Sequence, residues 1–155
     1  MIPPPRTRMT VQPDWVDYNG HMNVTYYVLA CDMATDKVYD KWGIGESYLT
    51  RGFSVYTLGM NVDYLSELHA GDPLVVSTQL LDCDHKRVHY FHTIRHAKTD
   101  VVAATNECLG MNIDLETKKS APFPDDVQAT LDAVLKQHKG YGVPKQAFRT
   151  LGIRR

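Results

Sequence analysis

Residues 23–43 read NVTYYVLACDMATDKVYDKWG, and they carry the clearest structural signal in the chain. Apolar side chains recur there every three or four residues, which is the period of an α-helix with one buried face. The members of that face are Val24, Tyr27, Val28, Cys31, Ala34, Val38 and Trp42. Asn23 is a favourable N-cap and Gly43 a favourable stop. The spacing therefore predicts a long helix that is capped by Asn23, begins at Val24 and ends at Trp42 before Gly43.

The chain after this helix takes on the composition of β-strands. Segments near 53–66, 74–82, 87–97 and 100–113 are rich in Val, Ile, Thr, Tyr and Phe, and short polar turns separate them. Within 109–113, apolar residues alternate with Gly and Asn, as in a half-buried strand. Four successive strands with short links predict an antiparallel meander. A further short strand is predicted before the helix, over 7–12.

The two ends of the chain differ from this middle part. Pro124 and two aspartates open a second predicted helix, which lysines and Gly140 close near residue 139. Residues 1–6 are expected to be a flexible lead-in, and 140–155 an extended basic tail. The element order predicts an α+β fold class, with an antiparallel sheet packed on the long helix.

Length and charge limit the function classes. The chain has 155 residues, 17 of them basic and 18 acidic, so its formal net charge is −1. This size predicts a single domain over 1–155, and the near-neutral charge argues against a nucleic-acid partner. No apolar run approaches the ~20 residues that span a bilayer, so no membrane partner is expected. Three dispersed cysteines and an N-terminus without a signal-like apolar region predict a cytoplasmic location.

The stretch DWVDYNGHMNVTYY, residues 14–27, carries the chemistry. It places Asp17 on a tight loop that leads into the helix, whose first N–H groups lack partners within the helix. Such amides, aided by the helix dipole, polarise a carbonyl oxygen that gains negative charge. A carboxylate beside those amides is the minimum for hydrolysing an activated acyl group. The alternative is an Asx turn over 17–20 that only caps the helix.

These residues resemble the hot-dog-fold acyl-CoA thioesterases of the 4-hydroxybenzoyl-CoA thioesterase type. The residues at the offsets of the family motif are Asp17, Gly20, His21, Met22, Asn23 and Tyr27. Asp63-Tyr64-Leu65, followed by Gly71-Asp72, matches a second motif of the family. The resemblance implies a hot-dog fold, in which about five antiparallel strands wrap around the long central helix. Residues 15–48 are also similar to the thioesterases of carnitine breakdown, which hydrolyse betainyl-CoA.

The resemblance also implies that the protein has a binding site for an acyl-CoA substrate and uses no cofactor. Asp17 would act as a nucleophile on the thioester carbonyl or as a general base for water, while backbone amides near Gly20 and His21 polarise the carbonyl. The implied substrate-binding residues are Asn23, Tyr27, Tyr18 and Tyr64. Lys86 and Arg87 would contact the phosphates of CoA, unless they only form a solvated strand end. Relatives of this kind are homo-oligomers, dimers or tetramers, with sites at the subunit boundary.

Two other side-chain sets suggest binding sites. One set of aromatic residues could form a cage for a quaternary ammonium group, or could simply be part of the core. Its members are Tyr18, Tyr27, Trp42, Tyr48 and Tyr56. A helical metal-site spacing is shown by His85, His89, His92 and His96. Because their segment is β-branched and aromatic, a strand is predicted, which divides these histidines between two faces. No metal site is therefore expected.

Two other functions compete with thioester hydrolysis. A hot-dog hydratase also pairs Asp with His near a helix start, but there His follows Asp by five residues, whereas His21 follows Asp17 by four. A non-catalytic module that binds acyl-CoA or acyl-carrier protein would keep the pocket without depending on Asp17 for turnover.

Overall fold

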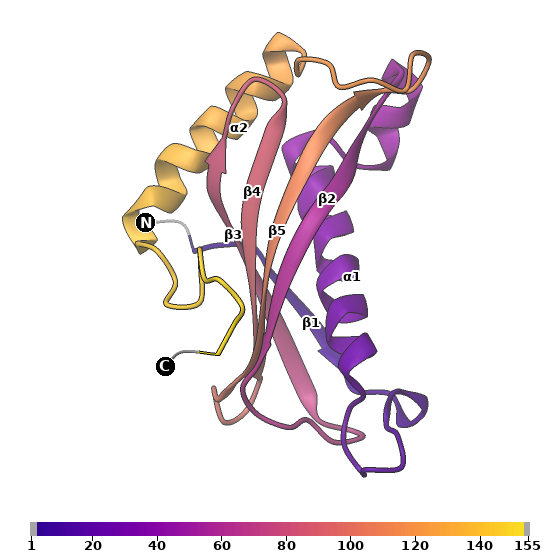
Figure 1. Cartoon of the computed structure of the whole chain (residues 1–155), viewed down its shortest axis with the longest axis vertical. Helices are drawn as coiled ribbons and strands as arrows, with labels where there is room; N and C mark the ends of the chain where they lie inside the picture. Colours follow the sequence, from indigo (N-terminus) through magenta and orange to yellow (C-terminus); the bar gives the residue numbers. More distant parts are fainter. Residues whose placement is uncertain (1–2, 154–155) are drawn as a thin grey trace.

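A computed structural model describes residues 3–153 as a five-stranded antiparallel sheet packed against a long helix (Figure 1). The strands are β1 (Arg6–Thr10), β2 (Phe53–Tyr64), β3 (Pro73–Cys83), β4 (Arg87–His96) and β5 (Val102–Asp114). The helices are α1 (Val24–Trp42) and α2 (Asp125–His138), and 3-10 turns cover Pro13–Trp15, Glu46–Arg51 and Lys139–Tyr141. The α+β fold class and each predicted element are confirmed, although β1 begins at Arg6, inside the predicted lead-in.

Helix α1 begins and ends at the residues that its sequence predicts. The Asn23 side chain accepts a hydrogen bond from the Thr25 N–H, and Gly43 closes the helix with a φ of 77°. The fully buried Ala30 and Ala34 let α1 lie close to the sheet. Gly110 of β5 is part of the same close approach, since a Cβ there would lie 3.0 Å from the hydroxyl of Tyr39.

The strand order is β1-β3-β4-β5-β2, and this corrects part of the sequence prediction. Strands β3, β4 and β5 form the predicted meander, but β2 pairs with β5 instead of β3. The connection over 65–72 crosses from one side of the sheet to the other, and on its way Leu68 accepts a hydrogen bond from the Met22 N–H. Alternation along a strand predicts which residues form it, but it does not specify the neighbouring strand.

Strand β3 has two different neighbours along its outer edge. Its first half, from Pro73 to Ser77, pairs with β1. Helix α2 packs beside its second half, as Figure 1 shows, and His138 Nδ1 accepts a hydrogen bond of 2.8 Å from the Leu80 N–H. The end of α2 therefore satisfies a backbone donor that the short β1 leaves open.

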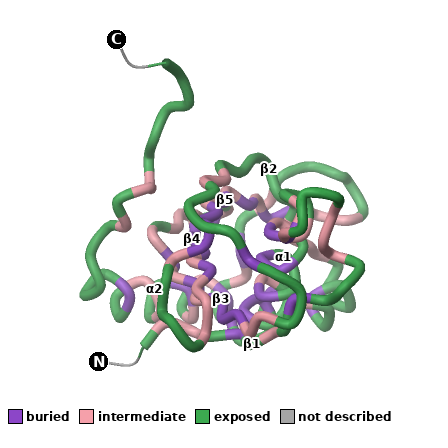
Figure 2. Tube along the Cα trace, turned by 90° about the horizontal axis from the view of Figure 1, so that it is seen from below, coloured by how far each residue is buried: buried purple, intermediate pink, exposed green. Residues whose placement is uncertain are grey.

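The buried residues lie mainly between α1 and the central strands, while the C-terminal segment projects from the body and is largely exposed (Figure 2). From 142 to 153 this segment has neither helix nor strand, and Arg149 forms an ion pair of 2.7 Å with Asp63 on β2. Arg154 and Arg155 of the predicted basic tail lie outside the described residues. Within residues 3–153, no helix is both long and apolar enough to cross a membrane.

Candidate functional site

A tight loop presents Asp17 at the start of α1. An isolated bridge joins Val16 and Met22 across the base of this loop, and the Gly20 N–H donates to the carbonyl of Asp17 at 3.0 Å. Gly20 has a φ of 81°, a conformation that favours glycine. The loop is therefore fixed by its own backbone, and it ends at the N-cap residue Asn23.

The carboxylate of Asp17 has two hydrogen-bond donors. Its Oδ1 accepts from the Asn19 N–H at 2.8 Å, and its Oδ2 accepts from Asn23 Nδ2 at 2.9 Å. The amide of Asn23, followed by the Asn19 N–H, holds the pKa of this carboxyl below its usual range. The Asx turn of the alternative interpretation is thus present, and it holds a half-buried aspartate whose carboxylate is charged at neutral pH.

The amides near Asp17 differ in their availability. The Thr25 N–H donates to Asn23 Oδ1 and the Tyr26 N–H to the carbonyl of Asn23, both at 3.0 Å. The Gly20 amide is occupied by the carbonyl of Asp17, so the structure does not support its predicted role in polarising a carbonyl. Within residues 3–153, the Val24 amide at the first position of α1 has no hydrogen-bond partner. It is the amide that the helix start offers to a ligand.

His21 lies on the same loop, and its side chain has partners of its own. Its Nδ1 is 3.2 Å from the carbonyl of Met22, and its Nε2 is 3.8 Å from a carboxylate oxygen of Glu67. Its predicted part in catalysis stays a prediction.

A cavity of about 320 Å³ opens beside the Asp17 carboxylate. The residues that line it are Asp14, Trp15, Val16, Asp17, Asn23, Thr25 and Tyr26. The rings of Trp15 and Tyr26 stack there at a centroid distance of 5.6 Å. The sequence prediction missed this aromatic pair, because it forms only when the 3-10 turn of Pro13–Trp15 folds back on the first turn of α1.

The predicted substrate-binding tyrosines take three different positions. Tyr27 is buried, and its hydroxyl accepts from the Leu68 N–H at 3.3 Å, so its predicted part in substrate binding stays a prediction. Tyr18 is 97% exposed. Tyr64 is 47% exposed, and its hydroxyl donates to the carbonyl of Val24 at 3.0 Å. Of the three, Tyr64 is the one whose hydroxyl bonds to the backbone of the helix start.

The proposed aromatic cage does not form within one chain. Trp42 and Tyr48 are fully buried in the core around the other end of α1, and Tyr48 stacks on Phe53. Tyr56 is half-exposed on β2 and Tyr18 stands in solvent. The alternative, that the buried members are core residues, is correct for this set.

Lys86 and Arg87 lie at the opposite end of the sheet from the Asp17 loop. The β3–β4 turn is at the top of Figure 1 and the loop before α1 at the bottom. Strand β4 lies between them, and its 10 residues span about 30 Å at ~3.3 Å per residue. The Arg87 guanidinium is paired with Asp84 at 2.5 Å, which lowers the pKa of Asp84 to about 2. Contact of these cations with CoA at the same chain's Asp17 is not supported.

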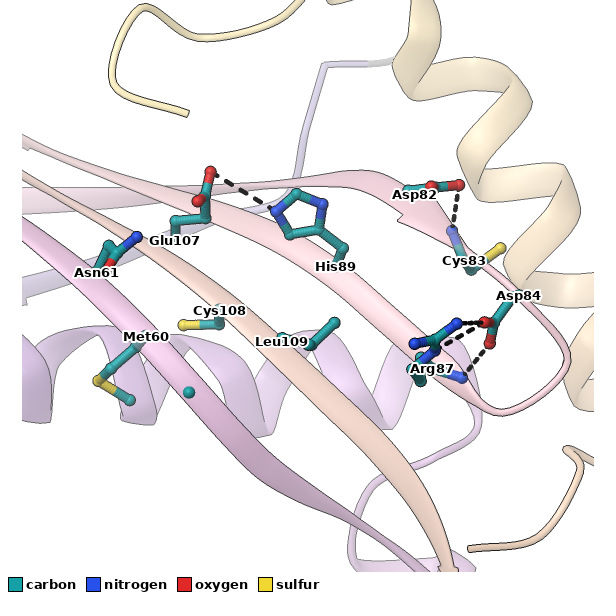
Figure 3. Close-up of a pocket in the computed structure, with 11 residues that line it drawn as sticks. Met60, Asn61, Asp82, Cys83, Asp84, Arg87, His89, Glu107, Cys108 and Leu109 are labelled. Atoms are coloured by element: carbon teal, nitrogen blue, oxygen red, sulfur yellow. Dashed lines mark hydrogen bonds and ion pairs between the residues drawn. The ribbon is translucent and has the colours of Figure 1, made fainter. Parts of the chain in front are cut away.

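Arg87 lines a larger cavity of about 600 Å³ on the face of the sheet away from α1 (Figure 3). His89 and Glu107, 3.6 Å apart, lie in the middle of this cavity, and Phe148 of the C-terminal segment packs its ring on His89. Its polar side chains are thus mostly paired with one another.

The four histidines are divided as the strand prediction requires. His89 lies on the outer face of β4, whereas His92 is fully buried between Thr35 and Thr78 on the face toward α1. His85 lies in the turn before β4. Among residues 3–153, no cluster of three or more His, Cys, Asp or Glu side chains is placed to hold a metal ion.

Comparison with known proteins agrees with this arrangement. A sequence profile of the thioesterase-like superfamily matches residues 11–131. A betainyl-CoA thioesterase of Pseudomonas aeruginosa is 33% identical over 144 residues, covering 92% of this chain and 91% of that protein. A Staphylococcus aureus protein solved in complex with CoA superposes with a TM-score of 0.91 at 25% identity, covering 99% of both chains.

A bifunctional L-carnitine dehydrogenase/betainyl-CoA thioesterase of Rhizobium meliloti is 34% identical over 145 residues. This match covers 94% of the present chain but 29% of that longer protein. The profile and the relatives confirm the hot-dog fold and favour thioester hydrolysis over hydration. The chain therefore belongs to the thioesterase-like superfamily and is a thioester hydrolase.

Proposed function

We propose that the protein hydrolyses acyl-CoA thioesters at the start of α1, with Asp17 as the catalytic carboxylate. The observation that carries this proposal is that, within residues 3–153, a carboxylate and an unpaired backbone N–H lie together at the start of α1. The Asp17 carboxylate is held 2.9 Å from the amide of Asn23, and the next residue, Val24, offers a backbone N–H without a partner in the described chain. An anionic oxygen and an oxyanion donor are the two groups that thioester hydrolysis needs.

The chemistry follows from that placement. The thioester carbonyl oxygen accepts a hydrogen bond from the Val24 N–H, and the helix dipole stabilises the charge that develops on it. As a nucleophile, Asp17 attacks the carbonyl carbon, the CoA thiolate leaves, and water then cleaves the mixed anhydride. As a general base, Asp17 takes a proton from the water that attacks the carbonyl carbon, and the CoA thiolate leaves when the tetrahedral intermediate collapses. Both routes use the charged form of Asp17.

Betainyl-CoA is the substrate that we propose first. The support is the similarity to a betainyl-CoA thioesterase over nearly the whole length of both proteins. The small cavity beside Asp17 also suits a short acyl group, since it measures about 320 Å³. CoA as the carrier is supported by the structural neighbour that was solved with CoA.

We also propose that the working unit contains at least two copies of the chain, either a dimer or a tetramer. Strand β2 is an edge strand, paired on one side only with β5. Its side chains include half-exposed apolar residues at 56, 58 and 60. Unpaired edges of this length and composition are sites of strand pairing. The cytoplasmic location expected from the sequence stays a prediction.

The test is the release of free thiol from a panel of acyl-CoA esters that includes betainyl-CoA. We expect Asp17→Asn to lower kcat by at least about 100-fold while its melting temperature stays close to that of the wild type. Asp125→Asn, which removes an exposed carboxylate at the start of α2, is the matched control and should retain full activity. Equal rates for Asp17→Asn and the wild type would contradict the assignment.

A further inference from the structure

We propose that the cavity between Asp17 and the stacked Trp15–Tyr26 pair is the acyl pocket, and that it selects acyl groups bearing a quaternary ammonium. This inference rests on the proposed function, and it assigns the substrate specificity of the enzyme to Asp14, Trp15 and Tyr26. The pocket combines an aromatic wall, the carboxylate of Asp14 and the reactive carboxylate of Asp17 within about 320 Å³. A short cationic acyl group is the ligand that uses all three features.

The aromatic wall is held in place by the backbone. The Asn23 N–H donates to the carbonyl of Trp15 at 2.9 Å, which ties the 3-10 turn to the start of α1. The rings of Trp15 and Tyr26 are nearly parallel, with an interplanar angle of 12°, and both pack partly on the core around Ala30 and Leu68. The wall is thus preorganised, and its ring faces carry the negative potential that attracts an ammonium group.

The charges of the pocket favour the same ligand. Asp14 and Asp17 both line it, and the described residues of the lining include no Lys, Arg or His. A cation is therefore attracted and an anionic acyl group is repelled. In the betainyl group, one methylene separates the quaternary nitrogen from the carbonyl carbon. A trimethylammonium group seated against the ring pair thus leaves its carbonyl beside Asp17 and the Val24 amide.

The decisive comparison uses two esters of the same shape. In 3,3-dimethylbutanoyl-CoA a carbon atom replaces the quaternary nitrogen of betainyl-CoA, so only the charge differs. We expect the wild type to prefer betainyl-CoA by at least about tenfold in kcat/KM. Trp15→Leu, Tyr26→Leu and Asp14→Asn should each lower that preference several-fold, chiefly through the betainyl ester. Phe148→Leu, which removes an exposed ring of the C-terminal segment, should leave the preference unchanged.

The outcomes separate this inference from the proposed function. An unchanged preference in the three variants, or an equal loss on both esters, overturns the inference while thiol release by the wild type upholds the function. If the wild type releases thiol from neither ester, the proposed function fails. Calorimetric affinities of the wild type and the same variants for both esters then decide the inference, which again requires a selective loss for the betainyl ester.

Discussion

The side chain of Asn23 has two tasks at the start of α1. Its Oδ1 caps the helix by accepting from the Thr25 N–H, and its Nδ2 donates to Asp17. The donated hydrogen bond is the first cause of the lowered pKa of Asp17. Because the proposed mechanism uses the charged carboxylate, we expect this bond to extend activity toward lower pH. We therefore propose that Asn23 positions Asp17, and its implied part in substrate binding stays a prediction.

Two substitutions separate these tasks. Asn23→Ser and Asn23→Asp both keep an oxygen that caps the helix, but neither supplies the amide donor to Asp17. The aspartate also places a like charge beside Asp17, which raises the pKa of that carboxyl. We expect the acid limb of the kcat/KM profile to move to higher pH in the order wild type, Ser, Asp, by about one pH unit for Asp.

Asn23→Ala is the matched control for the cap, since it loses both hydrogen bonds. We expect Asn23→Ala to lower the unfolding free energy by about 1 kcal/mol. Asn23→Ser keeps a capping oxygen, so its unfolding free energy should stay close to that of the wild type. A pH profile of Asn23→Ser that coincides with that of the wild type would show that Asn23 does not position Asp17.

The sequence predicts the residues of this site only as far as local signals reach. Asp17 and the N-cap Asn23 lie within one turn and one helix start, so spacing and residue type were sufficient for them. Tyr27 was assigned to the site although its helical spacing also predicts burial, and burial is what the structure shows. The pairing of Trp15 with Tyr26 has no signature in spacing, because it depends on how the 3-10 turn folds back.

At the level of elements, the contact between α1 and the sheet depends on Gly110. A Cβ at this position would lie 2.8 Å from a methyl carbon of Val55 and 3.0 Å from the hydroxyl of Tyr39. We expect Gly110→Ala to destabilise the protein by about 1–3 kcal/mol, since tightly packed neighbours must move. Gly59→Ala, on the edge strand β2 with open space around it, is the control. Urea unfolding of both variants would measure the difference, and equal effects would contradict the close approach.

Helix α2 is joined to the edge of β3 by an imidazole that must be neutral to accept. His138 Nδ1 receives the Leu80 N–H, and burial lowers the pKa of His138. The unfolded chain therefore binds a proton at higher pH than the folded chain does. The contribution of neutral His138 to the unfolding free energy is therefore complete above about pH 6.5, and it is lost as the pH falls below that value. Fully buried His92, with its pKa lowered by burial to about 3, adds a loss of the same sign.

His138→Asn keeps an acceptor near the position of Nδ1 but does not titrate in this range. We expect its unfolding free energy to fall less steeply than that of the wild type between pH 7 and 5, by up to about 1.4 kcal/mol per pH unit. Urea unfolding at several pH values measures the slope, and His85→Asn, at an exposed turn position, controls for the loss of an imidazole. Identical slopes for His138→Asn and the wild type would show that this imidazole does not govern the acid response.

The elements were largely predictable from local patterns, whereas their neighbours were not. Helix α1 has both of its caps in the sequence, so its bounds were predicted to the residue. The pairing of β2 with β5 joins residues at least forty positions apart, such as Asn61 and Glu107. Nothing in the period of either strand encodes that choice, which depends on how the connection over 65–72 packs across the sheet.

For the whole molecule, the edge strand β2 and the candidate site are continuous. Tyr64, the last residue of β2, donates from its hydroxyl to the carbonyl of Val24, whose N–H is the proposed oxyanion donor. Its ring also meets Tyr27 edge-on at 5.3 Å. A second copy that pairs along β2 would therefore contact the residues that hold the start of α1 in place. Loss of the partner should therefore lower the activity that depends on Asp17, even though the contacts of Asp17 within its own chain stay intact.

Leu58→Asp tests this coupling, because Leu58 is 51% exposed on β2 and an aspartate there opposes pairing of the edge. We expect the variant to sediment as a monomer at concentrations where the wild type is a dimer or tetramer, and to lose at least about tenfold in kcat/KM while keeping its fold by circular dichroism. Val101→Asp, a similarly exposed apolar position in the β4–β5 turn, should keep both the assembly and the activity. A monomeric Leu58→Asp variant with full activity would show that a single chain completes the site, and that the β2 edge serves assembly alone.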